Sequence, residues 1–176
     1  MNNLKEAHDT IKSKGFPYYP KDEKWRNNIY NMLLAFRRDT MVDHKNKVIG
    51  QATHGLNLAW SFMEHAWGIK CGKMKTPMEV WNDEEHLTKG INKILTGTFF
   101  KKKPLHDITD SDMRSMLRRY SGTQMVSNFR PTAAAALYDI FVDKDSPLEG
   151  TSAGTVWDPS MGEGGRLLGA IAAGIN

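Results

Sequence analysis

Glycines gather at one point of this sequence, beside its best candidate for a short β-strand. Seven of the fifteen glycines lie between Gly150 and Gly174. Residues 155–157, which read TVW, precede most of them, and residues 166–174, which read RLLGAIAAG, have helical spacing. Glycine adopts positive φ and lets the backbone approach a ligand without a Cβ in the way. The order strand, glycine-rich turn and helix therefore predicts one wall of a nucleotide-type ligand site, with the first helical amides directed at it.

The chain before residue 120 shows helical periodicity and no convincing strand. One helix start is complete, with Thr76 as N-cap, Pro77 in the first turn and Glu79 closing a capping box. The expected helices cover residues 1–14, 25–36, 48–67, 77–95 with Gly90 as a candidate break, and about 110–121. The sequence thus predicts a helical region followed by a different kind of structure.

One segment carries the net charge of +4. Residues 101–130 hold seven Lys and Arg and three acids, whereas the remainder holds seventeen of each sign. Such basic segments commonly contact phosphate backbones, although a solvated loop and helix end is an equal alternative. The candidate nucleic-acid contacts are Lys101, Lys102, Lys103, Arg114, Arg118 and Arg119.

Several kinds of site and location are not expected. No apolar run approaches the ~20 residues of a membrane span, and the polar start is no signal peptide. The single cysteine, Cys71, excludes an internal disulfide and favours the cytoplasm. His54 and His65 fall on one expected helix, but eleven residues separate them by ~16 Å. We therefore expect no metal site.

A likeness to a known family lies in residues 156–170, which read VWDPSMGEGGRLLGA. They resemble the AdoMet-binding motif of amino DNA methyltransferases, Asp-Pro-x-x-Gly-x-Gly-Gly. The matching residues are Asp158, Pro159, Gly162, Gly164 and Gly165. The resemblance implies that these residues shape the loop that binds S-adenosylmethionine.

A second likeness lies upstream, in residues 122–141, which read GTQMVSNFRPTAAAALYDIF. They resemble the segment that precedes the sheet in the γ-type motif order, a Phe-x-Pro turn followed by a helix. The resemblance implies that Phe129 and Pro131, and more loosely Asn128 and Arg130, lie over the methionine end of the cofactor. Both motifs together are most similar to phage-encoded DNA methylases.

The resemblance also defines what is missing. In this family a second strand ends in an acid that binds the ribose, and a later Asp/Asn-Pro-Pro-Tyr/Phe loop binds the flipped target base. This sequence contains no such tetrapeptide, so no catalytic residue is assigned. Weak or absent cofactor binding is expected from this chain alone.

These observations predict a mainly α fold, with a helical N-terminal domain and the incomplete start of a Rossmann-like methyltransferase α/β domain. The expected domains are residues 1–120 (helical), 121–149 (helical cofactor cover and connector) and 150–176 (first strand, glycine-rich loop and helix). One strand cannot form a stable sheet, so residues 150–176 are expected to be disordered or docked on a partner.

The implied function is that of the N-terminal part of a DNA methyltransferase, of adenine-N6 or cytosine-N4 type, inactive without a C-terminal catalytic portion. DNA and that portion, or another protein, are the expected partners, in the cytoplasm of a bacterial or phage-infected cell. Two alternatives stay open: a non-enzymatic phage-type helical protein that binds nucleic acid or protein, and a structural or oligomerisation module.

Overall fold

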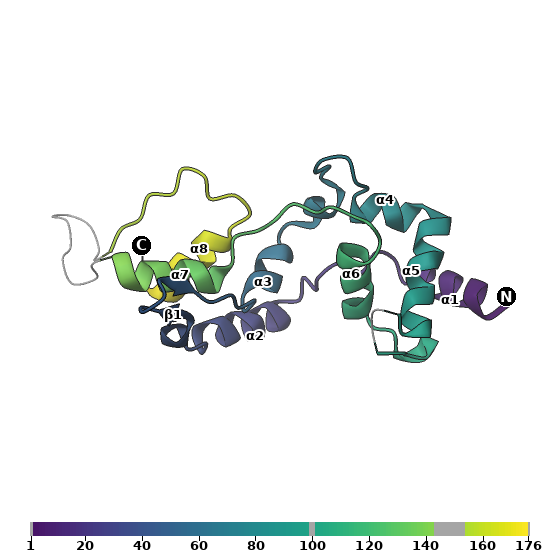
Figure 1. Cartoon of the computed structure of the whole chain (residues 1–176), viewed down its shortest axis with the longest axis horizontal. Coiled ribbons are helices and arrows are strands. Elements are labelled where there is room, and N and C mark those ends of the chain that lie inside the picture. Colours follow the sequence, from purple (N-terminus) through teal and green to yellow (C-terminus); the bar gives the residue numbers. More distant parts are fainter. Residues whose placement is uncertain (1, 99–100, 143–153, 176) are drawn as a thin grey trace. The chain divides into compact units, whose positions relative to one another are not determined.

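The computed structural model describes residues 2–98, 101–142 and 154–175 (Figure 1). This part of the chain contains eight α-helices and one two-stranded sheet, which confirms the prediction of a mainly α fold. The chain forms two compact units. Unit 1 consists of residues 1–18 and 64–126, and unit 2 of residues 19–63 and 127–176. Each unit thus combines two separate segments, whereas the ranges expected from the sequence are continuous.

Unit 1 is built around one central helix, α5, on which α1, α4 and α6 pack. Its elements are α1 (Asn2–Ser13), η2 (Glu64–Gly68, a 3₁₀ helix), α4 (Pro77–Asn82), α5 (Glu84–Thr96), η3 (Leu105–Asp107, a 3₁₀ helix) and α6 (Asp110–Arg119). The core residues with no exposed surface include Ala7, Val80, Leu87, Ile91, Ile94, Met116 and Leu117. Their helical spacing is the pattern that the sequence shows.

The predicted capping box is confirmed. Thr76 accepts a hydrogen bond from the backbone N–H of Glu79 at 3.0 Å, and the Glu79 carboxylate accepts one from the N–H of Thr76 at 2.6 Å. The helix that follows breaks at Asp83, not at Gly90. Asp83 has extended backbone and caps α5, because its side chain accepts the N–H of His86. Gly90 instead lies inside α5, buried against Met116.

Unit 2 contains the other four helices and a short hairpin. Its elements are α2 (Glu23–Leu34), η1 (Arg38–Met41, a 3₁₀ helix), β1 (Val42–Asp43), β2 (Val48–Ile49), α3 (Leu56–Trp60), α7 (Pro131–Phe141) and α8 (Gly165–Ala173). The main packing is between α7 and α8. Leu33 of α2 joins Ala135, Ala172 and Ala173 in the buried cluster of this unit.

The helix expected over residues 48–67 is wrong, and so is the expectation of no strand before residue 120. Val48 and Ile49 pair with β1 in an antiparallel hairpin. The carboxylate of Asp43 stabilises the turn, because it accepts hydrogen bonds from the N–H groups of Lys45 and Asn46, both at 3.0 Å. Such a local bond competes with helix formation. The rest of the range forms only α3 and η2, so His54 and His65 share no helix and lie in different units.

The glycine-rich end of the chain is described from residue 154. The strand expected over residues 155–157 is not formed, because residues 155–158 have no regular secondary structure and belong to no sheet of the described residues. The helix expected after the turn is confirmed as α8, and Gly174 is its C-cap with φ of 71°. Gly169 permits close packing, since a Cβ there would lie 2.5 Å from the Cβ of Ala134. The packing partner is α7. Residues 143–149 of the expected cover and connector segment 121–149 lie outside the described residues.

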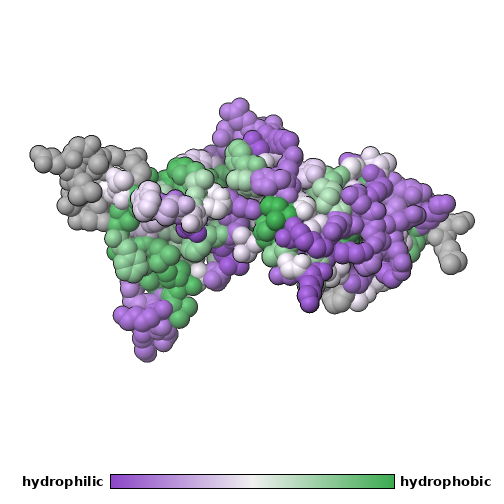
Figure 2. Space-filling view, turned by 90° about the horizontal axis from the view of Figure 1, so that it is seen from above, coloured by the Kyte–Doolittle hydropathy of each residue, from purple (hydrophilic) through white to green (hydrophobic). Residues whose placement is uncertain are grey.

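The surfaces of the two units differ in polarity. On the face seen in Figure 2, hydrophobic residues gather over unit 2, whereas unit 1 is mostly hydrophilic. Trp157 is 86% exposed, and Leu167 and Ile171 on α8 are 47% and 45% exposed. In the part of the chain that the structure describes, no helix has the length and apolar character needed to span a membrane.

Candidate functional site

Asp158 lies just before the turn at residues 159–160 and is bound by a guanidinium from α8. Arg166 donates two hydrogen bonds to its carboxylate, from Nε at 2.6 Å and from Nη2 at 3.1 Å. The backbone N–H of Ser160 donates a third at 3.1 Å. These donors, Arg166 above all, hold the pKa of Asp158 below its ordinary value. The carboxylate is therefore ionised at neutral pH and fixed in direction, with the side chain 23% exposed.

The turn between Asp158 and α8 requires glycine at two positions. Gly162 and Gly164 have φ of 62° and 78°, in the left-handed region that side chains rarely adopt. A Cβ on Gly164 would meet no heavy atom within 4 Å, and one on Gly162 would meet only the Ser160 carbonyl at 3.8 Å. The loop backbone therefore faces open space, which a ligand can approach.

The second motif lies directly against this turn. A Cβ on Gly165 would come far closer than 3.0 Å to the carbonyl oxygen of Phe129, and within 2.5 Å of Asn128 Oδ1. The side-chain amide of Asn128 donates to the Glu163 carbonyl at 3.2 Å. The Arg166 guanidinium lies 5.7 Å from the centre of the Phe129 ring. Two segments that are 35 residues apart therefore form one surface, although no strand joins them.

A pocket of about 210 Å³ adjoins Asp158 and α8. Its lining residues are Tyr138, Val156, Asp158, Met161, Arg166, Leu167, Ala170, Ile171 and Ile175. Burial and the Asp158 charge raise the pKa of Tyr138, so its hydroxyl is neutral at physiological pH. The pocket is smaller than the ~300–1,000 Å³ of typical ligand sites. It can therefore hold part of a cofactor-sized molecule, not all of it.

Pro131 and Pro159 shape the backbone near Phe129 and next to Asp158. Pro131 is buried as the first residue of α7, where its missing N–H costs nothing. Pro159 is exposed at the start of the turn that follows Asp158. The residues implied by the family resemblance are thus close neighbours in unit 2, around Asp158 and Phe129.

The six basic candidates in unit 1 differ in their surroundings. Lys103 forms an ion pair with Asp112 at 2.8 Å, and Arg114 donates to the carbonyls of Pro17 and Tyr18 at 3.2 and 3.1 Å. These two side chains stabilise the fold of unit 1. Lys101, Lys102 and Arg119 are exposed, and Arg118 is half-buried.

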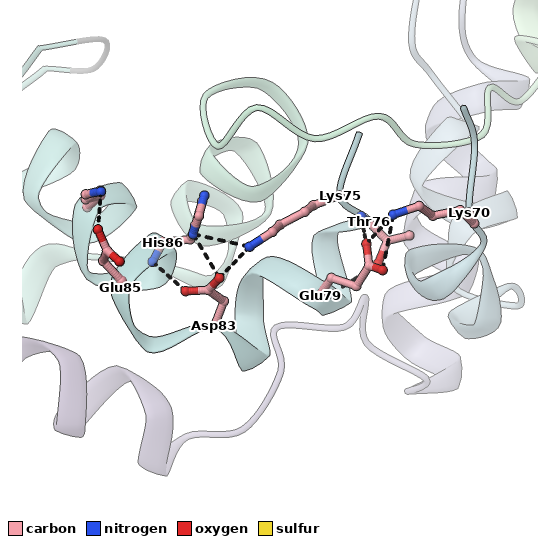
Figure 3. A network of polar contacts seen from close by, with 8 residues as sticks. Lys70, Lys75, Thr76, Glu79, Asp83, Glu85 and His86 are labelled. Atoms are coloured by element: carbon pink, nitrogen blue, oxygen red, sulfur yellow. Dashed lines mark hydrogen bonds and ion pairs between the residues drawn. The ribbon is translucent and has the colours of Figure 1, made fainter. Parts of the chain in front are cut away.

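A polar network in unit 1 joins α4 and α5 (Figure 3). Asp83 forms ion pairs with Lys75 and with His86, whose Nδ1 lies 2.9 Å from Asp83 Oδ2. Hydrogen bonds from Lys75 and from the His86 backbone hold the pKa of Asp83 far below its ordinary value. Nearby, Glu79 forms an ion pair with Lys70 at 3.0 Å. The network fixes the His86 ring through a carboxylate that stays ionised.

Sequence reasoning does not single out Arg166 or His86. A signal for Arg166 exists, because a cation at a helix N-terminus opposes the helix dipole and indicates an acidic partner nearby. For His86 the signal is Asp83 three residues earlier, at an N-cap position. Among the residues that the structure describes, no group of three or more His, Cys, Asp or Glu side chains could hold a metal ion.

Comparisons with known proteins assign no family or function to this chain. No model of a protein family, no curated protein and no solved structure matches the chain.

Proposed function

We propose that this chain is the N-terminal part of an AdoMet-dependent DNA methyltransferase, of adenine-N6 or cytosine-N4 type. The observation that carries the proposal is the close contact of Gly165 with Asn128 and Phe129. The two motifs that resemble the family are separate in sequence, and their resemblance alone does not require them to meet. Their meeting at one loop is what a shared cofactor surface needs.

The residues present fit one wall of a site for S-adenosylmethionine. Its amino-acid end carries an ammonium and a carboxylate, and the Asp158–Arg166 pair offers the complementary charges. Phe129, which is 41% exposed, supplies an apolar surface beside them. When bound, the cofactor supplies an electrophilic methyl group. The described residues of this chain bind and orient it but provide no group that activates a target amine.

The catalytic groups belong to a portion outside this sequence, because it contains no Asp/Asn-Pro-Pro-Tyr/Phe tetrapeptide. The exposed side chains of Trp157, Leu167 and Ile171 support this view. The apolar face of a helix normally packs against another element of the fold. These side chains are the surface that the missing portion would cover.

The proposal is tested by adding S-adenosylmethionine at millimolar concentration to the isotopically labelled full chain. We expect weak binding, with NMR shift changes confined to residues 128–131 and 158–166. Asp158→Asn should reduce these changes, and Asp39→Asn, a change at another ion-paired carboxylate of unit 2, should not. Shift changes outside these two segments, or equal shift changes in Asp158→Asn and Asp39→Asn, would contradict the proposal.

A non-enzymatic binding protein is the second candidate. The absence of the catalytic tetrapeptide favours it, since a protein that only binds needs none. The genomic sequence beyond codon 176 separates the two candidates. An acidic strand end followed by a Pro-Pro-aromatic motif there would support the methyltransferase, and an unrelated intergenic region would support the binding protein.

A further inference from the structure

Unit 1 contains a groove whose charged lining residues are all basic. It has a volume of about 490 Å³ and lies between α5 and the turn that follows α6. Its lining residues are His86, Lys89, Gly90, Asn92, Lys93, Thr98, Tyr120, Ser121 and Gly122. No Asp or Glu is among them.

The basic side chains of the groove come from one face of α5. His86, Lys89 and Lys93 are spaced by three and four residues, so they follow each other along this face. At ~1.5 Å per residue, the three charges extend over ~10 Å. Successive phosphates of a B-form strand advance by ~3.4 Å along the axis, so the row matches about three phosphates.

Two of these groups are held in place by bonds within unit 1. Lys93 donates to the Tyr120 carbonyl at 2.6 Å, which also offsets the negative carbonyl end of α6. The Nδ1 atom of His86 faces Asp83, and its second ring nitrogen is turned away from that carboxylate (Figure 3). Asp83 is itself neutralised by Lys75. The second ring nitrogen of His86 is therefore the one available to a ligand in the groove.

The carboxylate of Glu85, beside the groove, does not prevent an anion from reaching Lys89. Glu85 forms an ion pair with Lys89, but the two side chains are 74% and 65% exposed. Exposed pairs of this kind are weak and are readily exchanged for another anion. Lys103 and Arg114 of the basic segment are engaged within the fold, whereas Lys101, Lys102 and Arg119 are exposed. The α5 residues differ from these exposed side chains because they line one groove in a row.

We propose that the groove along α5 binds the phosphodiester backbone of a nucleic acid, through His86, Lys89 and Lys93. A linear polyanion fits better than a mononucleotide, because the charges lie in a row and the groove is open. The site is in unit 1 and does not depend on the cofactor wall in unit 2.

The test measures binding of the full chain to a fluorescein-labelled 12-base oligonucleotide by anisotropy, as single strand and as duplex, at several salt concentrations. Lys89→Glu should weaken binding to at least one form about tenfold at low salt. It should also lower the salt slope by about one. Lys73→Glu, which reverses an exposed charge of unit 1 outside the groove, should change the affinity less than twofold.

A second variant, His86→Gln, keeps Lys89 and should also weaken binding. Equal effects of Lys89→Glu and Lys73→Glu would overturn the proposal, as would binding that is independent of salt. Stronger competition by ATP than by unlabelled oligonucleotide, compared per phosphate, would overturn the assignment to a backbone. None of these results depends on the NMR shift changes in residues 128–131 and 158–166 that test cofactor binding. Failure of one proposal therefore does not contradict the other.

Discussion

The carbonyl oxygen of Phe129 lies where Gly165 would carry a Cβ. This single approach joins the turn before α7 to the first residue of α8, and the Asn128 amide reinforces it by donating to the Glu163 carbonyl. The contact links two motifs without a sheet between them. The candidate cofactor wall therefore requires glycine at position 165, because a side chain there would overlap the Phe129 carbonyl.

Gly165→Ala is expected to destabilise unit 2 by about 1–3 kcal/mol, because the backbone must move to admit the methyl group. Urea denaturation measures the loss, and NMR shifts at residues 128–131 show whether the loop has moved. The control is Gly68→Ala, since a Cβ there meets nothing within 4 Å. An effect of Gly165→Ala as small as that of the control would show that the close approach is absent in solution.

Asp83 should make unit 1 sensitive to acid. Its pKa is lowered in the folded state, chiefly by the Lys75 hydrogen bond. The carboxylate therefore stabilises the fold above its unfolded pKa, and this contribution is lost as the pH falls from about 4. Asp83→Asn keeps a good N-cap but removes the charge. The variant should be less stable at pH 7 and lose less stability between pH 5 and pH 2.

The control for this prediction is Asp22→Asn, which changes the N-cap of α2. Asp22 accepts the backbone N–H of Trp25 at 2.8 Å. Thermal melts across the acid range should show a shallower pH dependence for Asp83→Asn than for the native chain, and Asp22→Asn shows what the loss of a capping carboxylate alone does. Parallel curves for Asp83→Asn and the native chain would show that Lys75 does not interact with Asp83 in solution.

Predictions that depend on residues close together in sequence are correct here, whereas predictions that depend on tertiary packing are not. Local signals are confirmed: the Thr76 capping box is present, and the residues with helical spacing after the glycine-rich turn form α8. The apolar stripe over residues 48–67 misleads, because its residues divide between two units and Asp43 forms a competing turn. Periodicity reports that a residue is buried, but it does not tell which core buries it.

The candidate cofactor site was predictable in part. The resemblance placed Asp158, Gly162 and Gly164 in one loop, because those residues are adjacent in sequence. It did not predict the partner of Asp158, since the Arg166 bond depends on where the helix starts. The packing of α8 on α7 was also unforeseen, as an apolar helical face does not indicate whether a sheet or a helix covers it.

Gly90 and Met116 should be energetically coupled. A Cβ on Gly90 would overlap the thioether of Met116, with Cε at 2.9 Å. Alanine is favoured over glycine in a helix interior by about 0.5–1 kcal/mol, so net destabilisation by Gly90→Ala would reveal the overlap. In a Met116→Ala background the same change should cost less. A urea-based double-mutant cycle measures the coupling, and additive effects would contradict it.

Arg166 should control the ionisation of Asp158. The bidentate guanidinium is the main cause of the lowered pKa of Asp158, so Arg166→Gln should move its titration midpoint up towards the ordinary value. NMR of the carboxyl carbon measures the midpoint directly. Arg37→Gln, which removes the exposed partner of Asp39, should leave the Asp158 midpoint unchanged. A midpoint that stays low in Arg166→Gln would mean that the Ser160 N–H and the turn dominate. In that case the charge pair could not be the feature that presents Asp158 to a cofactor.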